Sequence, residues 1–70
     1  MHGQNPNVAE ADAMMVRAGE RMSAVSAHDP AAQLAMMAVN SWICGWAMMA
    51  PFFPGAVLVA GAIEKANFPA

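Results

Sequence analysis

Residues 31–63 contain no Asp, Glu, Lys or Arg, and this uncharged stretch constrains the fold more than any other feature of the sequence. After it, only Glu64 and Lys65 carry charge. A chain of 70 residues buries too little surface to hide so long an apolar stretch in its own interior. Hydrophobic residues make up 59% of the chain, against a usual share of about 45–50%. We therefore expect part of the stretch to face lipid, another apolar phase or other protein chains.

The charge balance argues against two classes of partner. The net charge is −2, and the chain has only three Lys and Arg residues. A protein that binds nucleic acid needs a basic face to neutralise phosphates. A protein held electrostatically on anionic lipid needs clustered Lys and Arg. We expect neither a nucleic-acid partner nor an electrostatic membrane anchor.

An amphipathic helix is predicted over residues 8–27. Asn7 fits the N-cap, and Glu10 follows at the spacing of a capping box. Arg17 and Glu20 are one helical turn apart and can form an ion pair. Apolar residues recur every three or four positions and form one stripe of a helix: Ala11, Met14, Met15, Ala18, Met22 and Val25.

A second helix is predicted over residues 30–50. Proline disfavours helical geometry in the residue before it. Asp29 is therefore the predicted N-cap, and Pro30 the first helical residue, where its missing N–H leaves no bond unmade. His28 stands beside this cap, and we interpret it as a residue of the helix end and not as part of a proton relay.

Pro51, Pro54 and Gly55 interrupt the second helix. Two prolines followed by glycine predict a kink or a tight turn, with Gly55 in the left-handed conformation. A third, shorter helix is predicted over residues 56–66. The predicted fold class is all-α: an N-terminal amphipathic helix, a proline joint, and a long apolar helix that is kinked or broken at residues 51–55 and embedded in a membrane.

Two membrane placements of the apolar stretch compete. Residues 30–50 match a bilayer core of about 30 Å but place Asn40 and Trp42 at its centre, where they fit poorly. Residues 42–63 place Trp42 and Trp46 near one interface and no polar side chain inside the core. We prefer the second placement. The prediction divides the chain into residues 1–29, a polar arm with an amphipathic helix, and residues 30–70, an apolar helical module that crosses the membrane once.

The orientation follows from the positive-inside bias. Arg17 and Arg21 precede the predicted crossing, and Lys65 is the single cation after it. Because Lys and Arg favour the cytoplasmic side, we expect a membrane protein with a cytoplasmic N-terminus.

Five residues are predicted to anchor helix packing. Trp42 and Trp46 are one turn apart on one helix face. A buried Asn40 needs a hydrogen-bond partner, most simply the same residue of a neighbouring chain. Ala56 and Ala60 have the small-xxx-small spacing that lets helix backbones approach closely.

No residue pattern predicts a catalytic, cofactor or metal site. The three Met-Met pairs and the single Cys44 allow a soft copper(I) site to be considered. Adjacent methionines point in different directions, however, so packing is the better interpretation. The sequence contains no nucleophile–base pair, paired carboxylates or glycine-rich phosphate loop. We expect that the protein is not an enzyme and that it binds no cofactor.

The sequence thus favours a non-catalytic, membrane-embedded structural or accessory subunit that packs its helices against other subunits or copies of itself. A soluble helical homo-oligomer or filament subunit is one alternative, because much of the apolar content is Ala and Met. A coat on a lipid or polyester granule is another. The run MSAVSAHDPAAQLAMM at residues 22–37 resembles phasins, which coat such granules.

Overall fold

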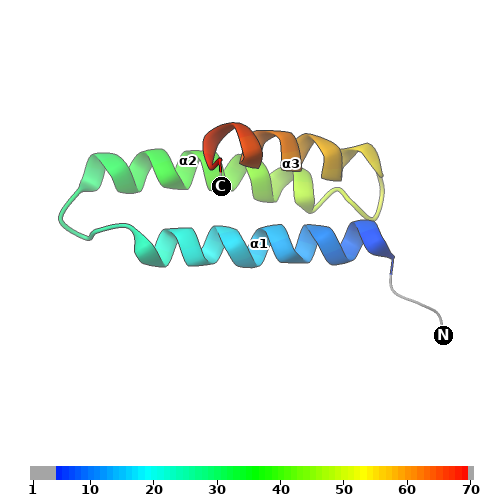
Figure 1. The fold of residues 1–70 in the computed structure, drawn as a ribbon, viewed down its shortest axis with the longest axis horizontal. Coiled ribbons are helices and arrows are strands. Elements are labelled where there is room, and N and C mark those ends of the chain that lie inside the picture. The colour runs from blue at the N-terminus through cyan, green and yellow to red at the C-terminus, as the bar shows by residue number, and fades with distance from the viewer. Residues whose placement is uncertain (1–4, 70) are drawn as a thin grey trace.

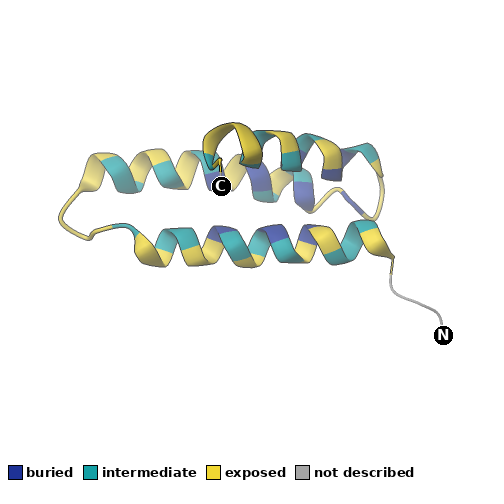
Figure 2. Ribbon diagram, viewed as in Figure 1, coloured by how far each residue is buried: buried dark blue, intermediate teal, exposed yellow. Residues whose placement is uncertain are grey.

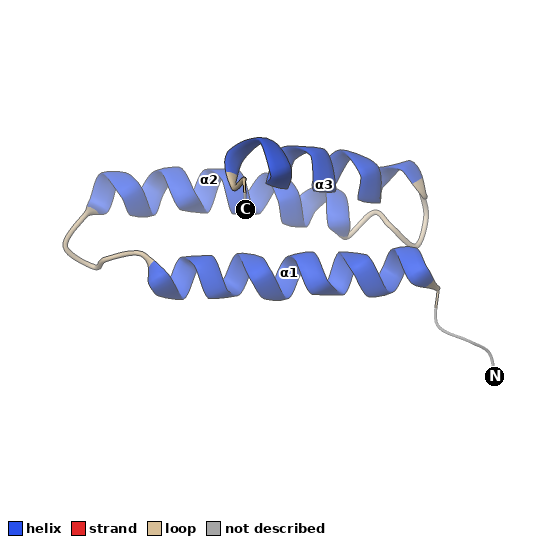
Figure 3. Ribbon diagram, viewed as in Figure 1, coloured by secondary structure: helices blue, strands red, loops and turns tan. Residues whose placement is uncertain are grey.

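Three helices make up the fold. The computed structural model describes residues 5–69, and its helices are α1 (Pro6–Ala24), α2 (Pro30–Ala47) and α3 (Gly55–Asn67). Helices α1 and α2 form an antiparallel hairpin, and α3 folds back along α2 (Figure 1). The all-α prediction is confirmed, since helices and loops alone form this described range (Figure 3).

The first helix begins earlier than predicted. Asn5 is its N-cap, and the Asn5 side chain accepts a hydrogen bond from the Asn7 backbone N–H at 2.9 Å. The prediction of Asn7 as the cap is therefore wrong. The physical reason is Pro6, which takes the first turn of the helix because it has no N–H to leave unpaired.

The joint between α1 and α2 is set by local hydrogen bonds. Val25 is extended and ends α1 before the predicted residue 27. The Ser26 hydroxyl then accepts a hydrogen bond from the His28 backbone N–H, and this bond stabilises the turn. Asp29 caps α2 at the predicted position, and its carboxylate accepts the Ala32 N–H at 3.1 Å.

The break after α2 is a reversal of the chain. Helix α2 ends at Ala47 and not at residue 50. The Met49 carbonyl then accepts the N–H groups of both Phe52 and Phe53. No glycine between residues 5 and 69 has a positive φ, so the predicted left-handed conformation of Gly55 is wrong. Because several residues share the reversal, no single one has to adopt that conformation.

This reversal changes the membrane prediction. Residues 42–63, the preferred span, form parts of two antiparallel helices and the turn between them (Figure 1). Among the helices of the described range, none is both long and apolar enough to cross a membrane. The prolines break the apolar helix instead of kinking it, so the helices give no support to the predicted crossing.

The core between the helices is narrow and built largely of alanine. Met14 of α1 and Ile43 of α2 are its largest fully buried side chains. A Cβ built on Gly61 would lie 3.7 Å from the Met14 Cε, so α3 approaches α1 closely at this point. The buried positions follow the inner sides of the helices (Figure 2). The buried core cluster consists of Ala11, Met14, Ile43, Ala47, Ala50, Val57 and Ala60.

Candidate functional site

An ionic cluster joins α1 to α3. Glu64 of α3 accepts two hydrogen bonds from Arg17, one to each carboxylate oxygen and both at 2.9 Å. It accepts a third from Arg21 Nη1 at 3.0 Å. The Glu64 side chain is 14% exposed, so most of this charge lies out of water. Three charge-assisted bonds therefore fix α3 against α1.

The cluster extends to α2 through Asn40. The Arg21 Nε donates to Asn40 Oδ1 at 3.0 Å, and the Arg21 guanidinium lies 4.1 Å from the centre of the Phe68 ring. Asn40 is 4% exposed and is the buried polar residue of the core. The sequence predicted a hydrogen bond from Asn40 to a neighbouring chain, whereas the structure gives its oxygen a partner within the same chain.

Two hydrogen-bond donors of this cluster have no partner in the described part of the chain. Arg21 Nη2 and Asn40 Nδ2 are buried and have no acceptor within residues 5–69. A buried donor without an acceptor costs about 1–3 kcal/mol. Such a group marks a place where a further acceptor would be bound favourably.

The electrostatics of the cluster favour structure over catalysis. Hydrogen bonds from Arg17, and then from Arg21, hold the pKa of the Glu64 carboxyl below its ordinary value despite burial. The same bond to Glu64 is the main cause that raises the pKa of Arg17. A carboxylate with a lowered pKa and both oxygens engaged is a poor general base. The cluster is therefore suited to clamp three helices together.

The pairing also differs from the sequence prediction. Arg17 binds Glu64 and, more weakly, the exposed Glu10 at 3.3 Å, and not the predicted Glu20. Glu64 thus offsets part of the positive charge on which the predicted membrane orientation rests. Spacing within one helix could not predict Glu64 as the partner of Arg17, because Glu64 lies on another helix.

Large apolar side chains are exposed along α2, in the turn that follows it and on α3. Trp42 is 63% exposed and Phe52 82% exposed. We call this set the apolar surface. Its members are Leu34 and Trp42 of α2, Met48, Met49, Phe52 and Phe53 of the turn, and Leu58 of α3.

The two tryptophans share a shallow groove in this surface. Trp42 and Trp46 line it together with Ser41, Gly45 and Met49. The Trp46 ring also lies 6.3 Å from the Phe53 ring, centre to centre. A Cβ on Gly45 would meet no atom within 4 Å, so the groove floor stays open. The predicted tryptophan pair is therefore brought together, with Trp46 half-buried and Trp42 exposed.

The small residues of α3 lie elsewhere. Ala56 and Ala60 are fully buried. Helix α3 packs mainly on α2, so the close approach that these alanines permit is used inside the chain.

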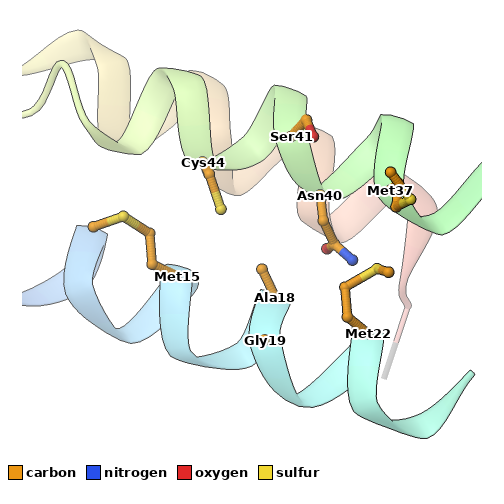
Figure 4. Close-up of a pocket in the computed structure, with 8 residues that line it drawn as sticks. All are labelled: Met15, Ala18, Gly19, Met22, Met37, Asn40, Ser41 and Cys44. Carbon is orange, nitrogen blue, oxygen red and sulfur yellow. The ribbon is translucent and has the colours of Figure 1, made fainter.

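A second groove runs between α1 and α2. It has a volume of about 340 Å³ and is lined by side chains that include Met15, Met22, Met37 and Cys44 (Figure 4). Asn40 also lines it. We call it the methionine groove. Across residues 5–69, no three or more His, Cys, Asp and Glu side chains come together as a candidate metal site.

Comparisons with protein-family models, with curated proteins and with solved structures find no match to this chain. The functional argument therefore rests on the surfaces described above.

Proposed function

We propose that the protein is a non-catalytic helical subunit that packs its apolar surface against other subunits or further copies of itself. The observation that carries this proposal is the character of α2. A helix on the surface of a soluble monomer normally presents charged and polar residues to water. The exposed side of α2 has no charged residue and presents Leu34 and Trp42 instead.

The shape and chemistry of the surface support a packing role. Trp, Phe and Met are the side chains that enrich the centres of protein interfaces. Gly45 leaves room beside Trp42 and Trp46 for a side chain of a partner. The ionic cluster lies on the α1–α3 side, where it holds the three helices together and leaves the apolar surface free of charge.

A membrane or another apolar phase is the second candidate for the surface that this subunit contacts. The uncharged turn supports it, because Phe52 and Phe53 with the neighbouring methionines could insert beside lipid without burying a charge. In this form the predicted membrane-embedded subunit would enter the bilayer with its turn and the outer side of α2. In the granule-coat alternative, the same turn and the same side of α2 would contact a lipid or polyester granule in place of a bilayer.

Sedimentation of matched variants tests the packing role. We expect the wild-type protein to sediment as a species heavier than one chain in buffer without detergent. Trp42→Asp should shift it toward the monomer, because the new carboxylate would be buried in the interface without a partner of opposite charge. Val16→Asp is the control, since Val16 is 61% exposed on α1 and lies outside the apolar surface. A wild-type monomer with a cooperative melt would contradict self-association.

Cell fractionation separates the two candidate surfaces. A membrane-embedded subunit should stay with membranes after a carbonate wash, and Phe52→Asp should release it. A subunit of a soluble assembly should appear in the supernatant as a large species that Trp42→Asp disperses. Recovery in the supernatant as a single chain would contradict both forms of the proposal.

A further inference from the structure

The methionine groove has one polar group of unusual position, the side-chain amide of Asn40. Asn40 is 4% exposed, and its amide points from α2 toward α1 near Ala18 and Met22 (Figure 4). Its oxygen is engaged by Arg21 Nε at 3.0 Å. Its nitrogen Nδ2 has no acceptor within the described range. The bond to Arg21 fixes which end of the amide acts as acceptor, so the end without a partner is a donor, and this donor is buried beside the groove that Asn40 lines.

Apart from Ser41, the rest of the lining is apolar and adaptable. Met15 and Met22 come from α1, and Met37 and Cys44 from α2. Methionine side chains are flexible and polarisable, and they fit apolar molecules of varied shape. The volume of about 340 Å³ falls at the lower end of the range of about 300–1,000 Å³ for small-molecule sites. A mostly apolar lining with a small number of placed polar groups is the usual composition of such a site.

Gly19 keeps the groove open. It lies in the interior of α1, where glycine destabilises a helix relative to alanine. A Cβ at this position would meet no atom within 4 Å, so packing inside the chain does not require glycine here. A side chain longer than alanine at residue 19 would instead enter the groove that Gly19 lines.

We propose that the methionine groove binds a small apolar molecule that carries a neutral carbonyl oxygen, such as a ketone, an ester or an amide. Because Nδ2 is itself buried, the flexible Met22 side chain beside it (Figure 4) moves aside when the carbonyl accepts its hydrogen bond. The hydrocarbon part then lies along the methionines. A neutral acceptor suits the site better than a carboxylate, because no charged residue lines the groove and the nearby Arg21 is already paired with Glu64. A helix from a second copy suits it less well, because the carbonyls of a helix interior already accept bonds from their own chain.

Cys44 provides a reporter for this site. It is the single cysteine of the chain, and it lines the groove with its sulfur directed into the space between α1 and α2 (Figure 4). A molecule bound along the methionines would cover it. The rate at which iodoacetamide alkylates Cys44 therefore measures occupancy.

The experiment compares 2-octanone with n-octane as probes of the full-length protein. At a ketone concentration of about ten times its Kd, alkylation of Cys44 should slow by about tenfold. The hydrocarbon should bind about three- to tenfold more weakly, because it lacks the acceptor for one hydrogen bond. Circular dichroism verifies that each variant below keeps its helical content.

Three variants separate the hydrogen bond from the apolar lining. Asn40→Asp keeps an oxygen for Arg21 but replaces the donor by an acceptor, so the preference for the ketone should disappear. Gly19→Leu should fill the groove and abolish protection by either probe, relative to the unprotected rate of the same variant. Gly45→Leu is the matched control, because it fills the shallow groove beside Trp42 and Trp46 and should leave protection of Cys44 unchanged.

Three results would overturn the proposal. Unchanged alkylation up to the solubility limit of 2-octanone would mean that the groove holds water alone. Equal affinity for ketone and hydrocarbon would mean nonspecific apolar partitioning. Protection of Cys44 that rises with protein concentration, and that 2-octanone does not change, would mean that a second copy covers the groove.

Discussion

Replacing Glu64 by glutamine tests whether the ionic cluster holds α3 in place. Glu64 accepts three charge-assisted hydrogen bonds from Arg17 and Arg21. Removing one partner of a fully buried ion pair costs about 3–5 kcal/mol, whereas an exposed pair contributes about 0.2–1 kcal/mol. Arg21 and Glu64 are 18% and 14% exposed, but Arg17 is 42% exposed. We therefore expect Glu64→Gln to lower the free energy of unfolding by about 2–4 kcal/mol.

Urea titration followed by circular dichroism measures this change, with all variants at one protein concentration because association would shift the apparent stability. Glu10→Gln is the control. Glu10 is 51% exposed and meets Arg17 at 3.3 Å, so its loss should cost at most about 0.5 kcal/mol. Equal effects of the two changes, or a Glu64→Gln effect below about 0.5 kcal/mol, would refute the clamp.

The pH dependence gives an independent check. The pKa of Glu64 is lowered in the folded protein from its ordinary value of 4.5. Its contribution is therefore complete above pH 4.5 and is lost as the pH falls through the lower folded-state pKa. The stability difference between the wild-type protein and Glu64→Gln should shrink in this acid range. A difference that stays constant down to acid pH would contradict the assigned cause.

Two further predictions concern the helices, and urea titration checks both. Asp29→Ala should lower the free energy of unfolding by about 0.5–2 kcal/mol through loss of the α2 cap. His28→Ala should be nearly silent, and a larger effect of the histidine change would contradict this assignment. Gly19→Ala should raise the free energy of unfolding by about 1 kcal/mol, because its Cβ meets no atom within 4 Å. A destabilised Gly19→Ala protein would mean that the open space is closed in solution.

Local signals in the sequence predicted the helices well. Asp29 and Pro30 mark the start of α2 because a cap and a first-turn proline act within a few residues. The error at the start of α1 has the same origin, since Asn5 and Pro6 form an equivalent signal two residues before the predicted Asn7. The same rule applied to both helices predicts Asn5 as the cap of α1.

The fold of the apolar half could not be derived from hydropathy. The prolines at 51 and 54 are compatible with a kinked span and with a reversal, and hydropathy is the same in both. What differs is packing. The reversal buries Ala56 and Ala60 within the chain, and small side chains there let the short α3 lie close to α2. Hydropathy along the chain contains no information about that contact.

The ionic cluster was missed because its partners are far apart in sequence. Arg17 and Glu64 are separated by 47 positions, beyond any helical spacing rule. A weaker signal was present, however. Arg17 and Arg21 are the two arginines of the chain and stand one turn apart on one helix face, whereas Glu64 is the single acid after the uncharged stretch. In a chain with few charges, such groups are each other's nearest candidates.

The cluster also explains how a chain with so few charges keeps α3 folded. A helix of 13 residues is marginal by itself in water, and the core that α3 covers is mostly alanine, which contributes little apolar area per contact. The three bonds to Glu64 add a directional attachment near the end of α3, while Ala56 and Ala60 secure its beginning. Because both attachments face α1 and α2, the outer side of α2 takes no part in folding α3. The exposed Trp42 therefore does not help to hold α3, and this is consistent with the proposal that it packs against another surface.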